Sequence, residues 1–307
     1  MSASVKNKQE FFKILESRII LGDGVKGTTL QELGYKTSPD LLNLNKDDLK
    51  VISGIHLKYL LAGSEIIQTN TLGSNPIKLQ SLGHAADLEQ ININAVNAAK
   101  EAINNYRSQT GSSREIFIAG EMSLSGRLLE PYGDLKFEDA VNAFSKQARI
   151  LIDSGVDLIL IETMIDLKEA LAAVEAVRKV SNIILIACTL SFTENGVTVM
   201  GNKADTFGKE LINAGCDIIG ANCSVGSKIM IKITEKIRNA NPDARLIIQP
   251  NAGLPIIVDG KTKFNETPEI MAENFKEILK FKPSIIGGCC GSTPEHIRKI
   301  AELIAIN

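Results

Sequence analysis

The sequence contains DSGVDLILIETM at residues 153–164, where an apolar helix pattern runs through a glycine into a short aliphatic stretch. The glycine is typical of a helix C-cap, and the unbroken aliphatic run is typical of a parallel strand that is buried on both faces. A similar phrase, with a glycine or another small residue before the aliphatic run, recurs as LAGSEIIQTNT (61–71), NAGCDIIGANCS (213–224) and FKPSIIGGCCGS (281–292). This repeated junction predicts alternating helices and parallel strands.

Four further aliphatic runs bring the predicted strands to eight: RIILGDG (18–24), EIFIAGEMS (115–123), NIILIACTLS (182–191) and RLIIQPNAG (245–253). Helical patterns between and after these runs cover residues 47–63, 84–108, 137–155, 166–181, 204–215, 226–240, 268–281 and 293–307. Eight such units in 307 residues favour an α/β fold of the (β/α)8 TIM-barrel type. We expect a single domain over residues 1–307, with residues 1–17 as a leading helix. An open doubly wound sheet with two halves is the alternative.

Composition and charge exclude several classes of protein. The chain is 44% hydrophobic and 23% charged, which is typical of a globular domain. A net charge of −2 argues against a nucleic-acid partner, because phosphate binding needs clustered Lys and Arg. We find no apolar run of the roughly 18–20 residues that a membrane span requires and no secretory signal, so we expect a cytoplasmic protein with no membrane partner.

Polar residues gather at the ends of the predicted strands. Because a barrel carries its chemistry at the carboxyl ends of its strands, these positions are the candidate site. In chain order they are Asp23-Gly24, Thr69-Asn70-Thr71, Gly120-Glu121, Glu162-Thr163, Cys188-Thr189, Asn222-Cys223, Pro250-Asn251 and Cys289-Cys290.

The cysteines indicate a metal site. Five in 307 residues are too sparse for a disulfide scaffold. Cys223, Cys289 and Cys290 follow the sixth and eighth predicted strands, so their thiolates can reach one centre. Soft thiolates select zinc, and three protein ligands with one open position form the catalytic pattern. The alternative is that all three are packing residues, as we interpret Cys188 and Cys216.

An open zinc site with three thiolates suits a thiol substrate. The three negative ligands make the metal a poor activator of water, whereas a substrate thiol can bind as a fourth sulfur and stay nucleophilic. The expected reaction is attack of the substrate thiolate on an electrophilic carbon, most simply a methyl group.

Several stretches resemble the homocysteine S-methyltransferase family, especially the homocysteine-binding module of cobalamin-dependent methionine synthase, here as a stand-alone chain. They are LGDGVKGTTLQELGY, AGSEIIQTNT, LIETM, GANC, PNAGLP and GGCCGSTPEHI. The resemblance runs from about residue 10 to the C-terminus. It implies a methyltransferase of methionine biosynthesis that moves a methyl group onto the thiolate of L-homocysteine.

The resemblance also implies a set of site residues. One zinc ion per chain is expected on Cys223, Cys289 and Cys290, with no catalytic residue beyond this site. The substrate amino group is expected at Asp23 and Glu162, and the substrate carboxylate at backbone N–H groups of Gly24, Thr69 and Asn70.

The methyl donor is the least determined part. The chain has no Asp-x-His-x-x-Gly cobalamin motif and ends after the eighth predicted helix. We therefore expect methylcobalamin carried by a separate corrinoid protein, and the alternative is a small donor such as S-methylmethionine. Two departures from the family pattern, Leu72 and the Leu124-Ser125 pair, bear on donor geometry more than on zinc.

Two functions of other classes stay open. Gly22, Gly24 and Gly27 spell the G-x-G-x-x-G of a nucleotide-dependent oxidoreductase, but no second strand ending in an acidic residue follows at the required distance. A non-catalytic barrel with a structural zinc site could instead act as a partner-binding module.

Overall fold

The computed structural model describes residues 8–258 and 261–306. Within them, eight parallel strands form one sheet, which confirms the predicted TIM barrel. The strands are β1 (Ile20–Leu21), β2 (Ile66–Gln68), β3 (Phe117–Met122), β4 (Leu158–Met164), β5 (Leu185–Leu190), β6 (Ile218–Gly226), β7 (Leu246–Asn251) and β10 (Ile285–Ile286).

Hydrogen bonds join the sheet into a ring. The paired strands run in the order β1, β10, β7, β6, β5, β4, β3, β2. At the seam between β1 and β2 the amide of Glu65 donates to the carbonyl of Leu21 at 2.7 Å, and the hydroxyl of Ser64 donates to the carbonyl of Gly22 at 3.1 Å. The open-sheet alternative is therefore wrong.

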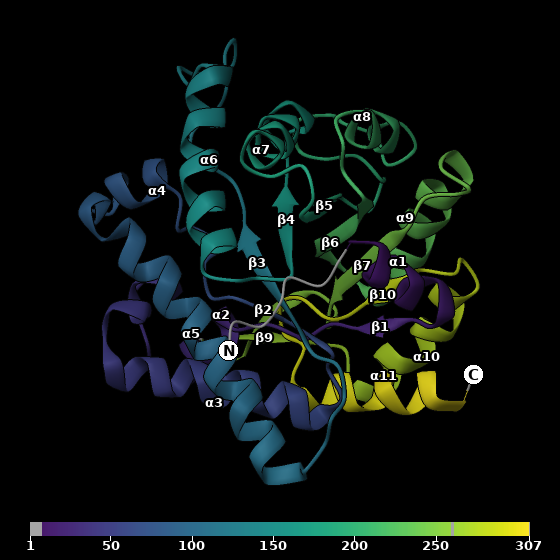
Figure 1. The fold of residues 1–307 in the computed structure, drawn as a ribbon. Coiled ribbons are helices and arrows are strands. Elements are labelled where there is room, and N and C mark those ends of the chain that lie inside the picture. Colours follow the sequence, from purple (N-terminus) through teal and green to yellow (C-terminus); the bar gives the residue numbers. More distant parts are fainter. Residues whose placement is uncertain (1–7, 259–260, 307) are drawn as a thin grey trace.

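Helices surround the strands, as Figure 1 shows. The eight that follow the predicted patterns are α3 (Lys46–Ala62), α5 (Leu88–Thr110), α6 (Phe137–Asp153), α7 (Leu167–Val180), α8 (Phe207–Asn213), α9 (Ser227–Ala240), α10 (Pro268–Leu279) and α11 (Pro294–Ile306). Each lies on the outside of the sheet, so both faces of every strand are buried and the strands can be aliphatic throughout.

Strand alternation separates two apolar layers. On β4, Leu158 and Leu160 belong to a cluster inside the barrel, whereas Ile159 and Ile161 belong to the larger cluster beneath the helices. The inner cluster uses residues from all eight strands and fills the lower part of the barrel. The polar strand ends are left at the other end, where a cavity lies.

Helix α1 (Lys8–Ser17) closes the amino-terminal end of the barrel. Its Phe11 and Leu15 are buried in the inner cluster, and the Phe11 ring meets the Phe117 ring edge-on at 4.6 Å between centroids. The leading helix predicted for residues 1–17 is thus present from Lys8 to Ser17, and residues 1–7 of that prediction lie outside the described residues.

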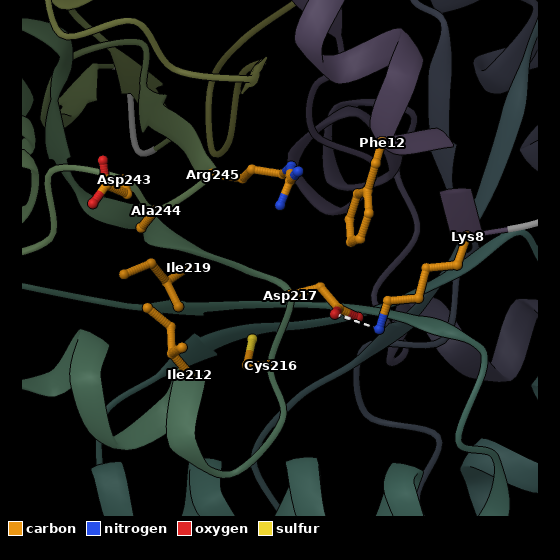
Figure 2. A pocket seen from close by; sticks show the side chains of 9 residues that line it. All are labelled: Lys8, Phe12, Ile212, Cys216, Asp217, Ile219, Asp243, Ala244 and Arg245. Atoms are coloured by element: carbon orange, nitrogen blue, oxygen red, sulfur yellow. Dashed lines mark ion pairs between the residues drawn. The ribbon is translucent and has the colours of Figure 1, made fainter. Parts of the chain in front are cut away.

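A hollow of about 410 Å³ lies beside α1 at this lower end (Figure 2). The Arg245 guanidinium lies 3.9 Å from the centre of the Phe12 ring, and Lys8 forms an ion pair with Asp217. Asp217 is also held by Arg178 at 2.7 Å. Because these charged groups already have partners within the chain, we interpret the hollow as the anchor of α1.

Four short insertions and a two-stranded hairpin were not predicted from the sequence. They are α2 (Gly27–Glu32), the 3-10 turns η1 (Pro39–Leu44) and η2 (Ala85–Asp87), α4 (Pro76–Ser81), and the antiparallel strands β8 (Pro255–Val258) and β9 (Lys261–Phe264). All of them lie in the loops between a strand and its following main helix. These loops form the rim of the barrel where the candidate site lies.

Candidate metal centre

Three cysteine side chains meet at the carboxyl ends of β6 and β10. The sulfurs of Cys223, Cys289 and Cys290 all lie within 4.8 Å of one another, and those of Cys223 and Cys290 are 3.8 Å apart. A tetrahedral zinc ion with Zn–S bonds of about 2.3 Å places two sulfur ligands about 3.8 Å apart. All three cysteines are free thiols. Their spacing therefore fits a shared zinc ion rather than a disulfide.

The backbone leaves regular strand geometry where β6 delivers its cysteine. Cys223 and Ser224 have φ values of 60° and 61°, in the left-handed region, and the pairing of β6 with β7 changes register between Asn222 and Gly226. A non-glycine residue in this region costs roughly 1–2 kcal/mol. Because of this backbone conformation, Cys223 is not paired with a residue of β7, and its side chain is available to the thiol cluster.

The paired cysteines after β10 are held by the end of β7 and by the residue that follows it. The amide of Cys289 donates to the carbonyl of Pro250 at 2.9 Å, and the amide of Ala252 donates to the carbonyl of Cys290 at 3.0 Å. The hydroxyl of Ser292 also donates to the carbonyl of Cys289, at 2.6 Å. These bonds hold the two thiols at a set position relative to β7.

Asn222 joins the thiol site to β4 and β5. Its side-chain oxygen accepts from the amide of Thr163 at 2.8 Å and from the hydroxyl of Thr189 at 2.7 Å. Its side-chain nitrogen donates to the Thr163 hydroxyl at 2.8 Å and lies 3.8 Å from the sulfur of Cys289. We interpret Asn222 as a residue that orients the thiols, a role that the sequence analysis did not assign.

The thiols influence one another's ionisation. Hydrogen bonds from Cys289 and Cys290 lower the pKa of Cys223, and the same contacts with the Cys223 thiolate raise the pKa of Cys289. The contact with Cys223 likewise raises the pKa of Cys290. Without a cation the cluster therefore favours one thiolate among the three sulfurs. Holding all three as thiolates calls for positive charge at their centre, which a divalent metal supplies.

A cavity of about 570 Å³ opens over the thiols. It lies at the carboxyl ends of the strands, where the predicted site residues gather. We call the end of the cavity beside the thiols its inner end, and we assign to it the lining residues Gly24, Lys26, Gln68, Glu121, Glu162, Thr163, Cys223, Gly288, Cys289 and Cys290. Its volume falls within the range of about 300–1,000 Å³ that is typical of small-molecule sites.

Buried acidic groups lie beside the thiols at this inner end. Glu162 is buried, and its pKa is raised by desolvation and by the adjacent Glu121 carboxyl group. The ammonium of Lys26 lies 3.3 Å from a carboxylate oxygen of Glu121, and both side chains are about 95% buried. Sequence reasoning did not assign Lys26 to the site. It noted Glu121 only as a polar strand end, and that position was the available signal.

Asp23 lies at the end of β1 with no exposed surface. One of its carboxylate oxygens accepts from the amide of Gln68 at 3.1 Å and so continues the β1–β2 seam. The other oxygen is buried without a hydrogen-bond partner among the described residues. Burial raises the pKa of Asp23 to about 7, against the influence of Lys26. Asp23 is not among the residues that line the cavity, so this unpartnered oxygen is a buried acceptor next to the cavity, where a cationic group would satisfy it.

Of the three residues predicted to bind the substrate carboxylate, two line the cavity and one does not. Gly24 and Asn70 line the cavity. Thr69 does not, because its amide donates to the carbonyl of Ala119 at 2.9 Å and its hydroxyl lies 2.7 Å from that of Thr71. The structure therefore brings Gly24 and Asn70 to the cavity and uses Thr69 within the sheet.

The absence of a side chain at Gly24 is a steric requirement. A Cβ atom there would lie 2.8 Å from the Ser292 hydroxyl and 2.8 Å from the ring and hydroxyl of Tyr59. The Tyr59 hydroxyl also donates toward the carbonyls of Val25 and Ser292, at 2.8 and 2.9 Å. Tyr59 thus packs the turn after β1 against the loop that carries the paired cysteines.

The remaining cysteines lie away from this centre. Cys188 is fully buried within β5, and the thiol of Cys216 donates to the carbonyl of Ile218 at 3.1 Å. This burial agrees with the packing role expected of both. Among the helices that the structure describes, we find none with the length and apolar character needed to cross a membrane.

Comparison with known proteins identifies a family. The model of the family described as "Homocysteine S-methyltransferase" matches residues 20–304. The methionine synthases of Mycobacterium leprae (strain TN) and Mycobacterium tuberculosis (strain ATCC 25618 / H37Rv) are each 28% identical to this chain over 311 residues. The match covers 96% of this chain and 25% of either relative, so the chain spans about a quarter of their length.

Solved structures show the same fold. The homocysteine methyltransferase MmuM from Escherichia coli superposes in its metallated form with a TM-score of 0.76 at 18% identity, over 92% of this chain and 96% of that one. Its apo form superposes with a TM-score of 0.70 at 19% identity, over 93% and 95%. At this identity the likeness supports the architecture alone.

Proposed function

The chain is an enzyme of the homocysteine S-methyltransferase family, and we propose that it transfers a methyl group to the thiolate of L-homocysteine to give methionine. The observation that carries this proposal is one cavity that joins a three-thiol cluster to buried carboxyl groups. Such a cavity offers a soft metal for a substrate sulfur and counter-charge for a substrate ammonium. Homocysteine carries both groups.

Cys223, Cys289 and Cys290 would hold the metal. Their spacing fits zinc, and they supply three ligands, so one position remains for a substrate. All three side chains are partly exposed to the cavity rather than sealed beneath it. Zinc bound there would favour the thiolate form of the substrate sulfur near neutral pH.

The acidic groups would bind the substrate ammonium. Asp23, Glu121 and Glu162 bring three carboxyl groups together, and Lys26 brings one positive charge. This excess of acid favours one further cation, and the unpartnered oxygen of Asp23 supplies an acceptor for it. We assign the ammonium to Asp23 and Glu162, with Lys26 neutralising Glu121.

The substrate carboxylate would lie against the backbone at the ends of β1 and β2. Gly24 and Asn70 line the cavity there, and the close packing of Tyr59 and Ser292 against Gly24 holds this stretch of main chain in place. Thr69 is proposed to support this turn through its own hydrogen bonds. Binding both ends of the amino acid orients its thiol, which lowers the entropic part of the barrier to transfer.

Two classes of methyl donor are proposed, and a different observation supports each. The relatives named methionine synthase are the more similar in sequence and support the predicted corrinoid protein as methylcobalamin carrier. The cavity of about 570 Å³ exceeds what homocysteine fills and supports a small donor such as S-methylmethionine. In either case the homocysteine sulfur would attack the donor methyl in line while the bond from that methyl to the donor's cobalt or sulfonium sulfur breaks. The electron pair of the broken bond would stay on the donor, and the thiol proton would be released to solvent.

Zinc X-ray absorption with and without L-homocysteine tests the acceptor. We expect three sulfurs and one lighter atom to become four sulfurs, and Cys290→Ser to lose zinc and methionine formation. Cys216→Ala, away from the centre, is the matched control and should lose neither. A wild-type shell that does not change with homocysteine would favour the partner-binding module with a structural zinc site.

A further inference from the structure

The cavity extends beyond the inner site into an outer end. This end lies between α2, η1, α4 and the loop after β3, and it is lined by Gln31, Ser38, Asp40, Leu72, Lys78 and Leu124. Homocysteine held at the thiols occupies the inner end. The outer end is therefore free for a second small molecule in the same compartment.

Lys78 brings an uncompensated positive charge to the outer end. Its side chain is half-buried and lies along Gly126, where a Cβ atom would be 3.2 Å from the Lys78 Cδ and 3.6 Å from its Nζ. Within the described part of the chain, its ammonium has no hydrogen bond or ion pair. The other lysine of the cavity, Lys26, is instead paired with Glu121.

Asp40 brings the opposite charge. Its Oδ1 accepts from the amide of Gly73 at 3.0 Å and the hydroxyl of Ser74 at 2.8 Å, and its Oδ2 accepts from the hydroxyl of Ser38 at 3.2 Å. A carboxylate has about four acceptor positions, so one remains. Asp40 is 5% exposed and has no cationic partner among the described residues.

The Asp40 carboxylate and the aliphatic stem of Lys78 both lie against Gly73. A Cβ atom at Gly73 would be 3.2 Å from the Oδ2 of Asp40 and 3.5 Å from the Cγ of Lys78. A larger residue there would separate them and narrow the cavity. The head group of an α-amino acid carries an ammonium next to a carboxylate. The carboxylate of Asp40 and the unpaired ammonium of Lys78 carry the opposite charges and can therefore bind the two groups.

We propose that Lys78 and Asp40 form an outer subsite that binds the zwitterionic head of a methyl donor of the amino-acid sulfonium class, Lys78 taking its carboxylate and Asp40 its ammonium. This inference rests on the proposed function, because it assigns the homocysteine to the inner end. Leu72 and Leu124 line the same region and supply apolar contact for the donor's methylene chain.

The reaction at this pair of subsites is balanced without a further reactant. The homocysteine sulfur forms a bond to the donor methyl carbon while the carbon–sulfonium bond breaks. The electron pair of that bond stays on the donor sulfur, which becomes a neutral thioether, and the thiol proton goes to solvent. With S-methylmethionine as donor, both products are methionine.

Donor kinetics test the subsite. In zinc-loaded protein with saturating L-homocysteine, Lys78→Met should raise the KM for S-methyl-L-methionine roughly 10- to 100-fold, the usual effect of losing one charge-assisted hydrogen bond. The KM for homocysteine should not change. Lys50→Met is the matched control, because Lys50 is 73% exposed on α3 and pairs with Asp47 outside the cavity. It should change neither constant.

A donor without the head group separates recognition from chemistry. Trimethylsulfonium should methylate homocysteine at equal rates with wild type and Lys78→Met. Calorimetric titration of S-methyl-L-methionine into the zinc-loaded protein without homocysteine should show the same 10- to 100-fold weakening in the variant. Asp40→Asn should weaken binding in the same assay, and Lys78→Met keeps the test decisive if the buried Asp40 variant does not fold.

Three results would overturn the subsite. These are an unchanged donor KM in Lys78→Met, an equal rise in the homocysteine KM, and a wild-type protein that uses methylcobalamin but not S-methyl-L-methionine. In each case a homocysteine-dependent fourth sulfur on zinc would leave the proposed function standing. Absence of that fourth sulfur would reject the function itself, and the subsite with it.

Discussion

Replacing Lys26 by methionine removes the cation that neutralises Glu121 inside the barrel mouth. The ammonium and the carboxylate oxygen are 3.3 Å apart, and each side chain is about 95% buried. At an effective dielectric constant of about 20, two unit charges at this separation attract by about 5 kcal/mol. Removing one partner of a buried pair costs about 3–5 kcal/mol, because the other charge stays desolvated. Methionine keeps the apolar stem, so the loss is mainly electrostatic.

We therefore expect Lys26→Met to lower the free energy of unfolding by about 3–5 kcal/mol at pH 7. The assay is urea denaturation of reduced, metal-free protein followed by circular dichroism. The double variant Lys26→Met/Glu121→Gln should recover part of the loss, since Glu121 no longer carries an unpaired charge, although Asp23 and Glu162 also lose the Lys26 cation. Lys50→Met removes an exposed pair and should cost under about 1 kcal/mol. A loss below about 1 kcal/mol in Lys26→Met, or a double variant no more stable than the single, would refute the argument.

Three further predictions concern the same rim. The pKa of Asp23 is raised from 3.8 to about 7 in the folded state, so between these two pH values the folded protein holds a proton that the unfolded protein releases. The free energy of unfolding should therefore fall by a few kcal/mol from pH 4 to pH 7. In urea titrations of metal-free protein Asp23→Asn should lessen that fall, and an unchanged fall would contradict the assignment. Asn222→Ala should weaken zinc binding roughly 10- to 100-fold in chelator competition, and equal affinity would show that Asn222 does not orient the thiols. Gly24→Ala should destabilise the fold by about 1–3 kcal/mol, because the added methyl group would contact Tyr59. Gly54→Ala lies in α3 with open space around it and should stabilise the fold by about 0.5–1 kcal/mol. Thermal unfolding of both variants checks the two predictions, and a change of stability in the opposite direction would contradict either one.

Local patterns were sufficient for the barrel itself. Each main helix and strand has an apolar pattern of its own period, and several helix-to-strand junctions carry a glycine, as at Gly63, Gly155 and Gly215. Parallel strands with buried faces admit few arrangements, so eight such units favour a closed ring over the open sheet that was the alternative. The hairpin β8–β9 was missed, although an Asp-Gly pair directly after the aliphatic run Pro255–Val258 was its available signal.

The thiol site could also be predicted from local patterns in the sequence. Cys223, Cys289 and Cys290 each follow a strand end, and the topology of a barrel brings strand ends together whatever their distance in sequence. Their residue type then limits the metal to a soft one. The cluster thus follows from strand order and thiol chemistry, which a sequence displays directly.

Only the tertiary structure decided which charges are paired. Lys26 and Lys78 are equally ordinary in the sequence, yet one is neutralised by Glu121 and the other has no partner among the described residues. Thr69 and Asn70 are neighbours, yet the first is used within the sheet and the second lines the cavity. The physical reason is the distance in sequence over which each property is determined. Periodicity and residue chemistry are local properties, whereas pairing and burial depend on distances between segments that only the folded chain brings together.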